Sequence, residues 1–380
     1  MRFLFVVPPL TGHVNPTISV ARTLESRGHQ VAWVGHPGKV RPLLPAGARL
    51  FVLPEHVDPD HARAVADAAR TARGAAALKF LWEDFLVPLA RQMRPGIEAA
   101  VTEFAPDVLV VDQQAIAGGL VARTRGIPWA TLATTSAGVT DPLATLPQVK
   151  RWLRDLFAEL EREANLEPTP DGELSPHRVI AFTTSALVGP AEKFPPHYRF
   201  VGPSISDRPE TTPFPFDQLR RPCALVSMGT VNAEASGRFY ATTIAGLRDH
   251  QVVLVAPQQL DAPDNFIVRP YVPQLALMAH VDAVVCHGGH NTTCEALAHG
   301  LPLVIAPIKD DQPIVADQVV AAGAGLRVKF GRVGPDELRT AVNRVLVEPA
   351  FREAAQRVRA SFEAAGGAAA AATALEELGA

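Results

Sequence analysis

Short apolar runs rich in β-branched residues alternate along the chain with longer segments of helical periodicity, and this alternation occurs twice. It is typical of parallel sheets built from βαβ units, because each parallel strand needs a crossover connection, usually a helix, before the next. The predicted fold class is therefore α/β with parallel sheets. A chain of 380 residues is also too long for one ordinary core, so we expect two domains with a cleft between them.

The first half carries predicted strands at 2–7, 31–34, 49–53, 107–111, 129–132 and 179–183. The second half carries them at 224–227, 252–256, 266–268, 283–286 and 303–306. Asn15 as N-cap, Pro16 at the first helical position and Gly28 just past the end predict a helix after the first strand. Residues 58–104 are Ala-rich and predict helix broken near Pro88.

Between Val201 and Pro222 the chain is rich in prolines and small polar residues and shows no periodic pattern of apolar residues. This composition predicts an interdomain linker at 206–221. The predicted domains are then 1–205 and 222–365. The final segment, 366–380, is Ala-rich with few large apolar side chains, so this helix needs a docking surface, and we expect it to return to the first domain.

The formal net charge is -3, and acidic and basic residues are interspersed along the chain. The chain therefore has no long-range positive potential that would attract nucleic acid or an anionic membrane. Three cysteines without CxxC spacing predict neither disulfides nor a cysteine zinc site, and they favour a reducing cytoplasm. No signal peptide and no apolar stretch of about 18 residues is found, so membrane insertion is not expected.

The segment Cys286–Glu295, CHGGHNTTCE, follows a predicted strand and opens a helix. Glycines let a backbone approach an anion closely, and helix-terminal amides and the helix dipole favour negative charge. We therefore predict a diphosphate site here, with Glu295 one turn into the helix as an acceptor for ribose hydroxyls. The alternatives are a plain glycine turn with an N-cap, or zinc held by His287 and His290, for which no third ligand has the required spacing.

Two other loops follow strands of the same predicted sheet, and ligands bind at that carboxyl edge. Ser227, Gly229 and Thr230 offer hydroxyls and a close backbone for phosphate, whereas Asp311 and Gln312 offer groups that sugar hydroxyls bind. Each loop alone is also compatible with an ordinary turn.

In the first half, His13 lies between a strand and its helix, and Asp112 ends a later strand of the same sheet. A neutral imidazole accepts a proton from a hydroxyl, and a carboxylate on its other nitrogen stabilises the imidazolium. No G-x-S-x-G elbow accompanies the pair, which favours direct displacement by an activated acceptor over covalent catalysis. A surface or capping role is the alternative for a single loop histidine.

Asp58-Pro59-Asp60 and Asp310-Asp311 resemble the carboxylate pairs of metal sites. Such sequences are also common in turns, and each offers fewer oxygen ligands than a divalent cation needs, so no metal site is predicted. The segments 78–89 and 133–146 are apolar and small-residue-rich, and either line an acceptor site or pack as core, as Phe80, Trp82 and Phe85 can do. Residues 151–163 are amphipathic and of mixed charge, which predicts a core-facing helix.

Five segments in order along nearly the whole chain resemble one family: VVPPLTGHVNP at the N-terminus, the VSMGT loop, Tyr271–Gln274, the HGGHNTTCEAL block and DDQ at 310–312. The chain is similar to the GT-B UDP-glycosyltransferases of glycosyltransferase family 1, including bacterial enzymes that glycosylate macrolides and other natural products. The resemblance implies two Rossmann-like domains, with the acceptor held by the first and the donor mostly by the second. It also implies inversion at the anomeric carbon without a metal.

The resemblance implies His13 as the general base and Asp112 as its partner. It implies His287, Gly289, Asn291 and Thr292 as the diphosphate loop, Glu295 as the ribose acceptor, Tyr271 and Val272 as the base-binding pair, and Asp311 and Gln312 as the sugar-binding pair. Gln274, Gly288 and His290 lie within the same resembling segments and complete the predicted donor-binding set. Tyr271 and His290 replace tryptophans common in plant members, which points to the bacterial branch, where thymidine as well as uridine donors occur.

The sequence therefore predicts an enzyme without cofactor or metal that moves a sugar from a UDP- or dTDP-sugar onto a lipophilic small molecule, as a monomer or homodimer. One alternative is a nucleotide-sugar epimerase on the same architecture, which needs no acceptor. Another is a noncatalytic nucleotide-sugar-binding subunit, which would have no use for His13 and Asp112.

Overall fold

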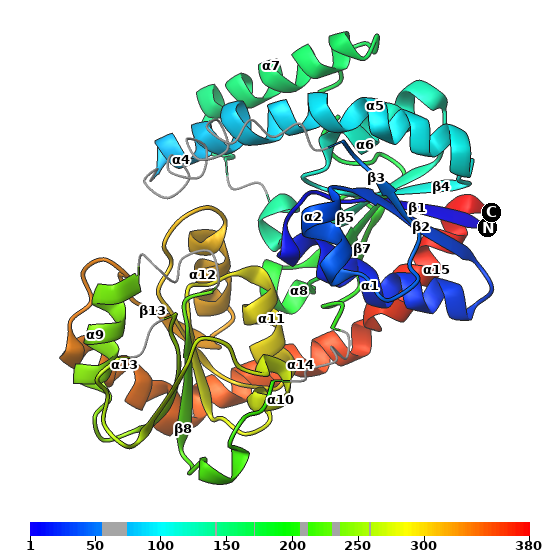
Figure 1. Cartoon of the computed structure of the whole chain (residues 1–380). Helices are drawn as coiled ribbons and strands as arrows, with labels where there is room; N and C mark the ends of the chain where they lie inside the picture. Colours follow the sequence, from blue (N-terminus) through cyan, green and yellow to red (C-terminus); the bar gives the residue numbers. More distant parts are fainter. Residues whose placement is uncertain (55–73, 141–142, 171, 206–211, 230–235, 258–259) are drawn as a thin grey trace. The chain divides into compact units, whose positions relative to one another are not determined.

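The computed structural model describes residues 1–380 except 55–73, 141–142, 171, 206–211, 230–235 and 258–259 (Figure 1). The chain divides into two compact units. The first contains Met1–Thr183, Ala191–Ser206 and Ala365–Ala380, and the second contains Thr184–Pro190 and Asp207–Ala364. Each unit is described by itself.

The first unit is built on a seven-stranded sheet in the order β3-β2-β1-β4-β5-β6-β7, in which every pairing is parallel. The strands are β1 Arg2–Val6, β2 Gln30–Gly35, β3 Leu50–Val52, β4 Val108–Asp112, β5 Trp129–Ala133, β6 Arg178–Ala181 and β7 Tyr198–Phe200. The helices are α1 Thr11–Ser26, α2 Pro37–Val40, α4 Ala75–Lys79, a π-helix at Phe80–Leu86, α5 Val87–Phe104, α6 Ile116–Arg125, α7 Pro147–Glu163 and α15 Gly367–Gly379.

Both faces of this sheet are buried, as a parallel sheet requires. Alternate residues of β1 point to opposite faces: Leu4 and Val6 join the core beneath α5 and α6, whereas Phe3 and Phe5 join the core beneath α1 and α15. Helix α15 comes from the end of the sequence yet packs against α1 from its beginning (Figure 1). Leu375, fully buried, anchors it in that core.

Helix α1 begins five residues earlier than the sequence predicted, at Thr11 and not at Pro16. Leu10, in extended conformation, is the N-cap, and its carbonyl accepts hydrogen bonds from the amides of His13 (3.0 Å) and Val14 (3.1 Å). Pro16 therefore lies inside the helix rather than at its first position, where its missing N–H costs one intrahelical bond. His13 consequently lies in the first helical turn and not in a loop.

The second unit has a six-stranded sheet, again parallel throughout, in the order β10-β9-β8-β11-β12-β13. Its strands are β8 Cys223–Ser227, β9 Gln251–Val255, β10 Phe266–Arg269, β11 Ala283–Cys286, β12 Leu303–Ile305 and β13 Gly325–Arg327. Its helices are α8 Ser185–Val188, α9 Gly237–Gly246, α10 Gln274–Met278, α11 His290–Ala298, α12 Gln312–Ala321, α13 Pro335–Val347 and α14 Pro349–Ala365. The two parallel sheets confirm the predicted α/β class.

Strands β7 Tyr198–Phe200 and β13 Gly325–Arg327 were not predicted from the sequence. Each has only three residues and lies at the edge of its sheet, so neither carries the long apolar run by which central strands are recognised. Part of the predicted linker, 206–211, lies outside the described residues. Phe214 and Phe216, from the remainder, pack against the core of the second unit.

Strand order reverses once in each sheet. In the first sheet the chain winds outward from β1 through β2 and β3, and then returns to place β4 on the other side of β1. In the second sheet β8 and β11 are neighbours for the same reason. The carboxyl ends of such adjacent strands leave a crevice in which open α/β sheets bind ligands.

No helix among the described residues is long and apolar enough to cross a membrane. Helix α7 buries Leu153, Phe157 and Leu160 in the first unit, as predicted for a core-facing helix.

Candidate functional site

His13 and Asp112 meet at the reversal point of the first sheet. Asp112 is the last residue of β4, and His13 lies in the first turn of the helix that follows β1. The two side chains are hydrogen bonded, with His13 Nδ1 2.9 Å from Asp112 Oδ1 and 3.0 Å from Oδ2. The Asp112 side chain is fully buried, whereas 15% of the His13 side chain remains exposed.

A third residue, Thr134, completes this cluster and was not predicted. Its hydroxyl donates to Asp112 Oδ2 (2.7 Å) and lies 2.8 Å from His13 Nδ1. The backbone amide of Gln114 donates to Asp112 Oδ1 at 2.8 Å. Since a carboxylate only accepts, these bonds favour the His13 tautomer that carries its proton on Nδ1. The Nε2 atom is then the basic nitrogen of His13.

A sequence signal for Thr134 existed, because it directly follows the strand β5, next to β4 in the sheet. Polar residues at that position share the carboxyl edge with Asp112. Gln113 and Gln114 were also not predicted, although they directly follow β4 and so lie at the same edge of the sheet. Their amide oxygens are buried and lack a hydrogen-bond partner within the described part of the chain, so two acceptors lie beside the cluster.

In the second unit the three predicted loops meet at one place. A Cβ added at Gly229, in the loop after β8, would lie 2.7 Å from His287 Cε1 in the loop after β11. A Cβ added at Gly288, whose φ is +86°, would lie 3.1 Å from the carbonyl oxygen of Gln312, the first residue of α12, where the loop after β12 ends. The structure thus brings together the segments around Ser227, His287 and Gln312. Thr230 lies outside the described residues.

The imidazole of His287 lies between two glycines. A Cβ at Gly289 would lie 2.5 Å from His287 Nε2, so both Gly229 and Gly289 are needed for the ring to occupy this position. Burial lowers the pKa of His287, which keeps the ring neutral near pH 7. Its Nδ1 is buried and has no hydrogen-bond partner among the residues that the structure describes.

Helix α11 begins directly after this glycine pair, with Gly289 as its N-cap. Its first regular bond runs from the Thr293 amide to the Gly289 carbonyl at 3.0 Å. The amides of His290, Asn291 and Thr292 therefore belong to the first turn, where amides point out of the helix end and the dipole is positive. The side chain of His290 is buried against the thiol of Cys294, at 3.5 Å, and faces the interior.

Glu295 is buried, with 3% exposed, and its Oε2 accepts a 2.6 Å hydrogen bond from Gln274 Nε2. Gln274 is the first residue of α10, so this bond ties α10 to α11. Tyr271 is 54% exposed, whereas Val272 is buried. A ligand can thus contact Tyr271 directly, whereas Val272 offers almost no exposed surface.

Gln312 begins α12 and is buried, and its Oε1 accepts the amides of Ile308 (2.9 Å) and Lys309 (3.1 Å). Its amide oxygen therefore fixes the loop that precedes α12, so only Nε2 of this side chain is left to bind a ligand. Asp311 is the N-cap residue of α12, at the same end of the helix.

Within the described ranges, no group of three or more His, Cys, Asp or Glu side chains is arranged to hold a metal ion. Asp58-Pro59-Asp60 lies outside those ranges. Cys223, Cys286 and Cys294 are free and buried, and burial raises the pKa of Cys223 to about 12 and of Cys286 to about 11. The thiols are therefore protonated near neutral pH and are poor nucleophiles.

Of the segments considered for an acceptor site, 78–89 contains the π-helix Phe80–Leu86, a rare conformation that is frequent at functional sites. Trp82 and Phe85 are half-buried against the first unit's core, as the core-packing alternative requires, while keeping some exposed surface. Trp152 Nε1 donates to Glu83 at 3.0 Å and fixes the π-helix to α7.

Comparison with known proteins identifies the family. Residues 241–378 match the family model of the erythromycin biosynthesis protein CIII-like C-terminal domain. The chain is 32% identical to 4'-demethylrebeccamycin synthase of Lentzea aerocolonigenes, over 96% of each chain, and 28% identical to the NDP-glycosyltransferase YjiC of Bacillus subtilis (strain 168), over 97% of this chain and 95% of that one.

Among solved structures, the glycotransferase of kitacinnamycin matches with a TM-score of 0.84 and 26% identity, covering 99% of this chain and 98% of that one. That agreement extends over both parallel sheets, so the architecture is GT-B. With a relative 32% identical along nearly its whole length, the chain belongs to glycosyltransferase family 1, in its natural-product branch, and is a nucleotide-sugar glycosyltransferase.

Proposed function

We propose that the enzyme transfers a sugar from a UDP- or dTDP-sugar to a hydroxyl of a lipophilic natural product, with inversion, without a metal, and with His13 as the general base. The hydrogen-bonded cluster of His13, Asp112 and Thr134 is the observation on which this proposal chiefly depends. Binding a nucleotide sugar alone requires no such cluster. An imidazole whose Nδ1 is paired with a buried carboxylate is suited to taking a proton at Nε2.

The base step follows from the two hydrogen bonds of His13. Asp112 holds the proton on Nδ1, so Nε2 accepts the proton of the acceptor hydroxyl as that oxygen attacks the anomeric carbon. The ring then becomes an imidazolium, and the carboxylate 2.9 Å from Nδ1 stabilises the new charge. The glycosidic bond forms as the bond to the diphosphate breaks, and inversion follows from this single displacement.

The leaving diphosphate gains negative charge during this step. The first-turn amides of α11 and the dipole of that helix stabilise it, which is the work that a metal performs in other transferases. His287 contributes as a neutral ring. Its buried Nδ1 lacks a partner among the described residues, so a phosphate oxygen would satisfy an otherwise unpaired group.

The remaining donor contacts are assigned to the surrounding loops. Tyr271 contacts the nucleobase through its exposed ring and Val272 through its backbone, while Glu295, steadied by Gln274, accepts from the ribose hydroxyls. Asp311 and Gln312 bind the hydroxyls of the sugar. The names of two relatives, 4'-demethylrebeccamycin synthase and the glycotransferase of kitacinnamycin, support a natural-product acceptor.

The test is a matrix of UDP- and dTDP-sugars against lipophilic hydroxyl acceptors, read by product mass, with the wild type and His13→Ala. Transfer by the wild type is expected, and His13→Ala should lose about 10² to 10⁴ in kcat while its Kd for UDP stays within about twofold. Full activity of His13→Ala with an alcohol acceptor would refute the base assignment. Interconversion of nucleotide sugars without an acceptor would instead support the epimerase alternative.

A further inference from the structure

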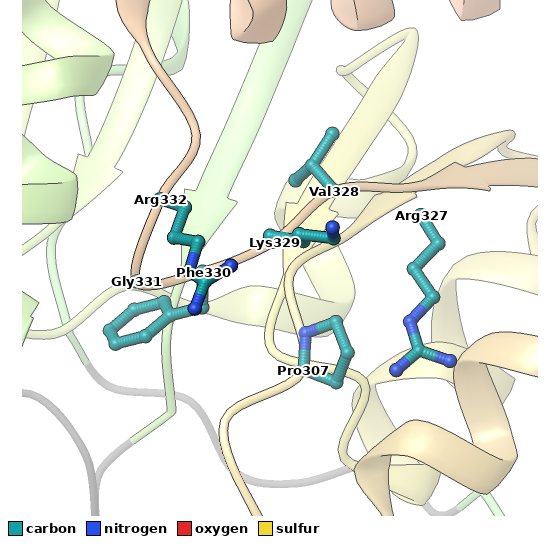
Figure 2. A pocket seen from close by; sticks show the side chains of 7 residues that line it. All are labelled: Pro307, Arg327, Val328, Lys329, Phe330, Gly331 and Arg332. Atoms are coloured by element: carbon teal, nitrogen blue, oxygen red, sulfur yellow. The ribbon is translucent and has the colours of Figure 1, made fainter.

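A separate cavity of about 270 Å³ lies in the second unit (Figure 2). It is lined by Pro307, Arg327, Val328, Lys329, Phe330, Gly331 and Arg332. Pro307 belongs to the loop that follows β12, and Val328–Arg332 follow β13, so the cavity opens at the carboxyl ends of these two strands. This is the sheet edge at which α/β proteins bind ligands.

The walls of the cavity carry a surplus of positive charge. Three of the six residues from Arg327 to Arg332 are cationic, and the sequence has no acidic residue between Asp317 and Asp336. Arg327 is paired with Asp317 at 2.5 Å. Lys329 and Arg332 make no ion pair with any residue that the structure describes. In a chain of net charge -3, this is a local excess and not a reflection of the whole molecule.

The loop that carries these cations is held in place from three sides. The amide of Val328 donates to the Ile305 carbonyl at 2.8 Å, which continues the pairing of β13 with β12. Phe330 stacks on Phe239 of α9, with ring centroids 5.4 Å apart, and the Arg238 guanidinium donates to the Gly331 carbonyl. The backbone is thus positioned before any ligand arrives, which reduces the entropy cost of binding.

We propose that this cavity binds a phosphate group, either as inorganic phosphate or as a small phosphate monoester. A guanidinium presents parallel donors that match phosphate oxygens, and an ammonium adds a point charge. The volume lies below the roughly 300 to 1,000 Å³ of pockets that hold drug-sized ligands, so a nucleotide does not fit. Strand β13 lies two strands from β11, about 10 Å away, and the cavity is therefore distinct from the donor diphosphate loop.

Calorimetric titration at constant ionic strength tests this site, with inorganic phosphate in one arm and glucose 6-phosphate in the other. Saturating UDP is present throughout, so that the donor loop is occupied. Saturable binding is expected, with at least about a tenfold loss of affinity in the double variant Lys329→Ala/Arg332→Ala. Equal affinities in the two arms identify free phosphate as the ligand, whereas tighter binding of the ester identifies a phosphorylated metabolite.

Arg339→Ala is the matched control, because this arginine lies nearby in the chain on α13 and is already paired with Asp336. It should retain wild-type affinity. Circular dichroism and the Kd for UDP establish that each variant is folded. Absence of saturable phosphate binding in the presence of UDP, or wild-type affinity in the double variant, would overturn the proposal. Because no turnover is measured, these outcomes are independent of whether the proposed transfer reaction is correct.

Discussion

Replacing Asp112 by asparagine removes one charge from the first unit's cluster and leaves its shape unchanged. Asparagine is isosteric with aspartate, and its Oδ1 can still accept the Gln114 amide and the His13 Nδ1 proton. Its amide group can donate to Thr134, whose hydroxyl turns from donor to acceptor. The variant therefore isolates the electrostatic contribution of the carboxylate to the proposed mechanism.

The magnitude follows from the 2.9 Å between His13 Nδ1 and Asp112 Oδ1. A unit charge pair at that distance interacts by about 1.4 kcal/mol at the dielectric constant of water and by about 6 kcal/mol at an effective value of about 20. The buried carboxylate favours the larger value, but the imidazolium shares its charge between two nitrogens, which roughly halves it. About 3 kcal/mol corresponds to a loss of roughly a hundredfold in kcat.

The assay is steady-state release of UDP or dTDP together with product mass, alongside the Kd for UDP, which should not change. Asp107→Asn is the control, since Asp107 precedes the opposite end of the same strand and likewise accepts a backbone hydrogen bond, from the Arg2 amide at 2.6 Å. It should keep wild-type kcat. If Asp112→Asn turns over within about twofold of the wild type, the carboxylate does not stabilise a protonated His13, and the reasoning is wrong.

Three further outcomes are expected. Gly289→Ala should weaken UDP binding at least about tenfold in calorimetry, because its Cβ would lie 2.5 Å from His287 Nε2, whereas Gly237→Ala, with open space around it, should bind normally. Leu375→Ala should lower the free energy of unfolding by about 2 to 5 kcal/mol in urea, since the side chain is fully buried. The pKa of His287 is lowered by burial, so below about pH 6.5 the unfolded chain binds a proton that the folded chain resists, and stability falls on acidification. His287→Gln should flatten that acid-side loss in urea titrations at pH 5 to 7, and an unchanged slope would contradict this.

The central strands and the convergence of loops were predictable because both follow from local patterns. Buried parallel strands carry apolar runs on both faces, and their carboxyl ends necessarily share one edge. That reasoning was sufficient to place His13 near Asp112, and the loops of Ser227, His287 and Gln312 near one another. The donor, acceptor and catalytic roles of these residues remain predictions.

Features that depend on tertiary contacts were not predictable from the sequence. The start of α1 was misplaced because Pro16 is normally read as a helix start, whereas here the carbonyl of Leu10 starts the helix a turn earlier. Thr134 was missed because its place after a strand predicts only which edge of the sheet it shares, whereas its hydrogen bonds to His13 and Asp112 depend on tertiary contacts. The edge strand β13 was too short to recognise, and with it the basic turn Arg327–Arg332 was overlooked.

The place of α15 in the core of the first unit has a consequence for biosynthesis. A ribosome delivers the seven strands of the first sheet long before it delivers Gly367–Gly379. Until then, the apolar sheet face of Phe3 and Phe5, against which Leu375 later packs, stays partly uncovered. The nascent chain therefore exposes an aggregation-prone apolar surface while the whole second unit is synthesised. The first unit is therefore the last to mature, and chaperone contact with its uncovered face is expected to end only when the final helix emerges.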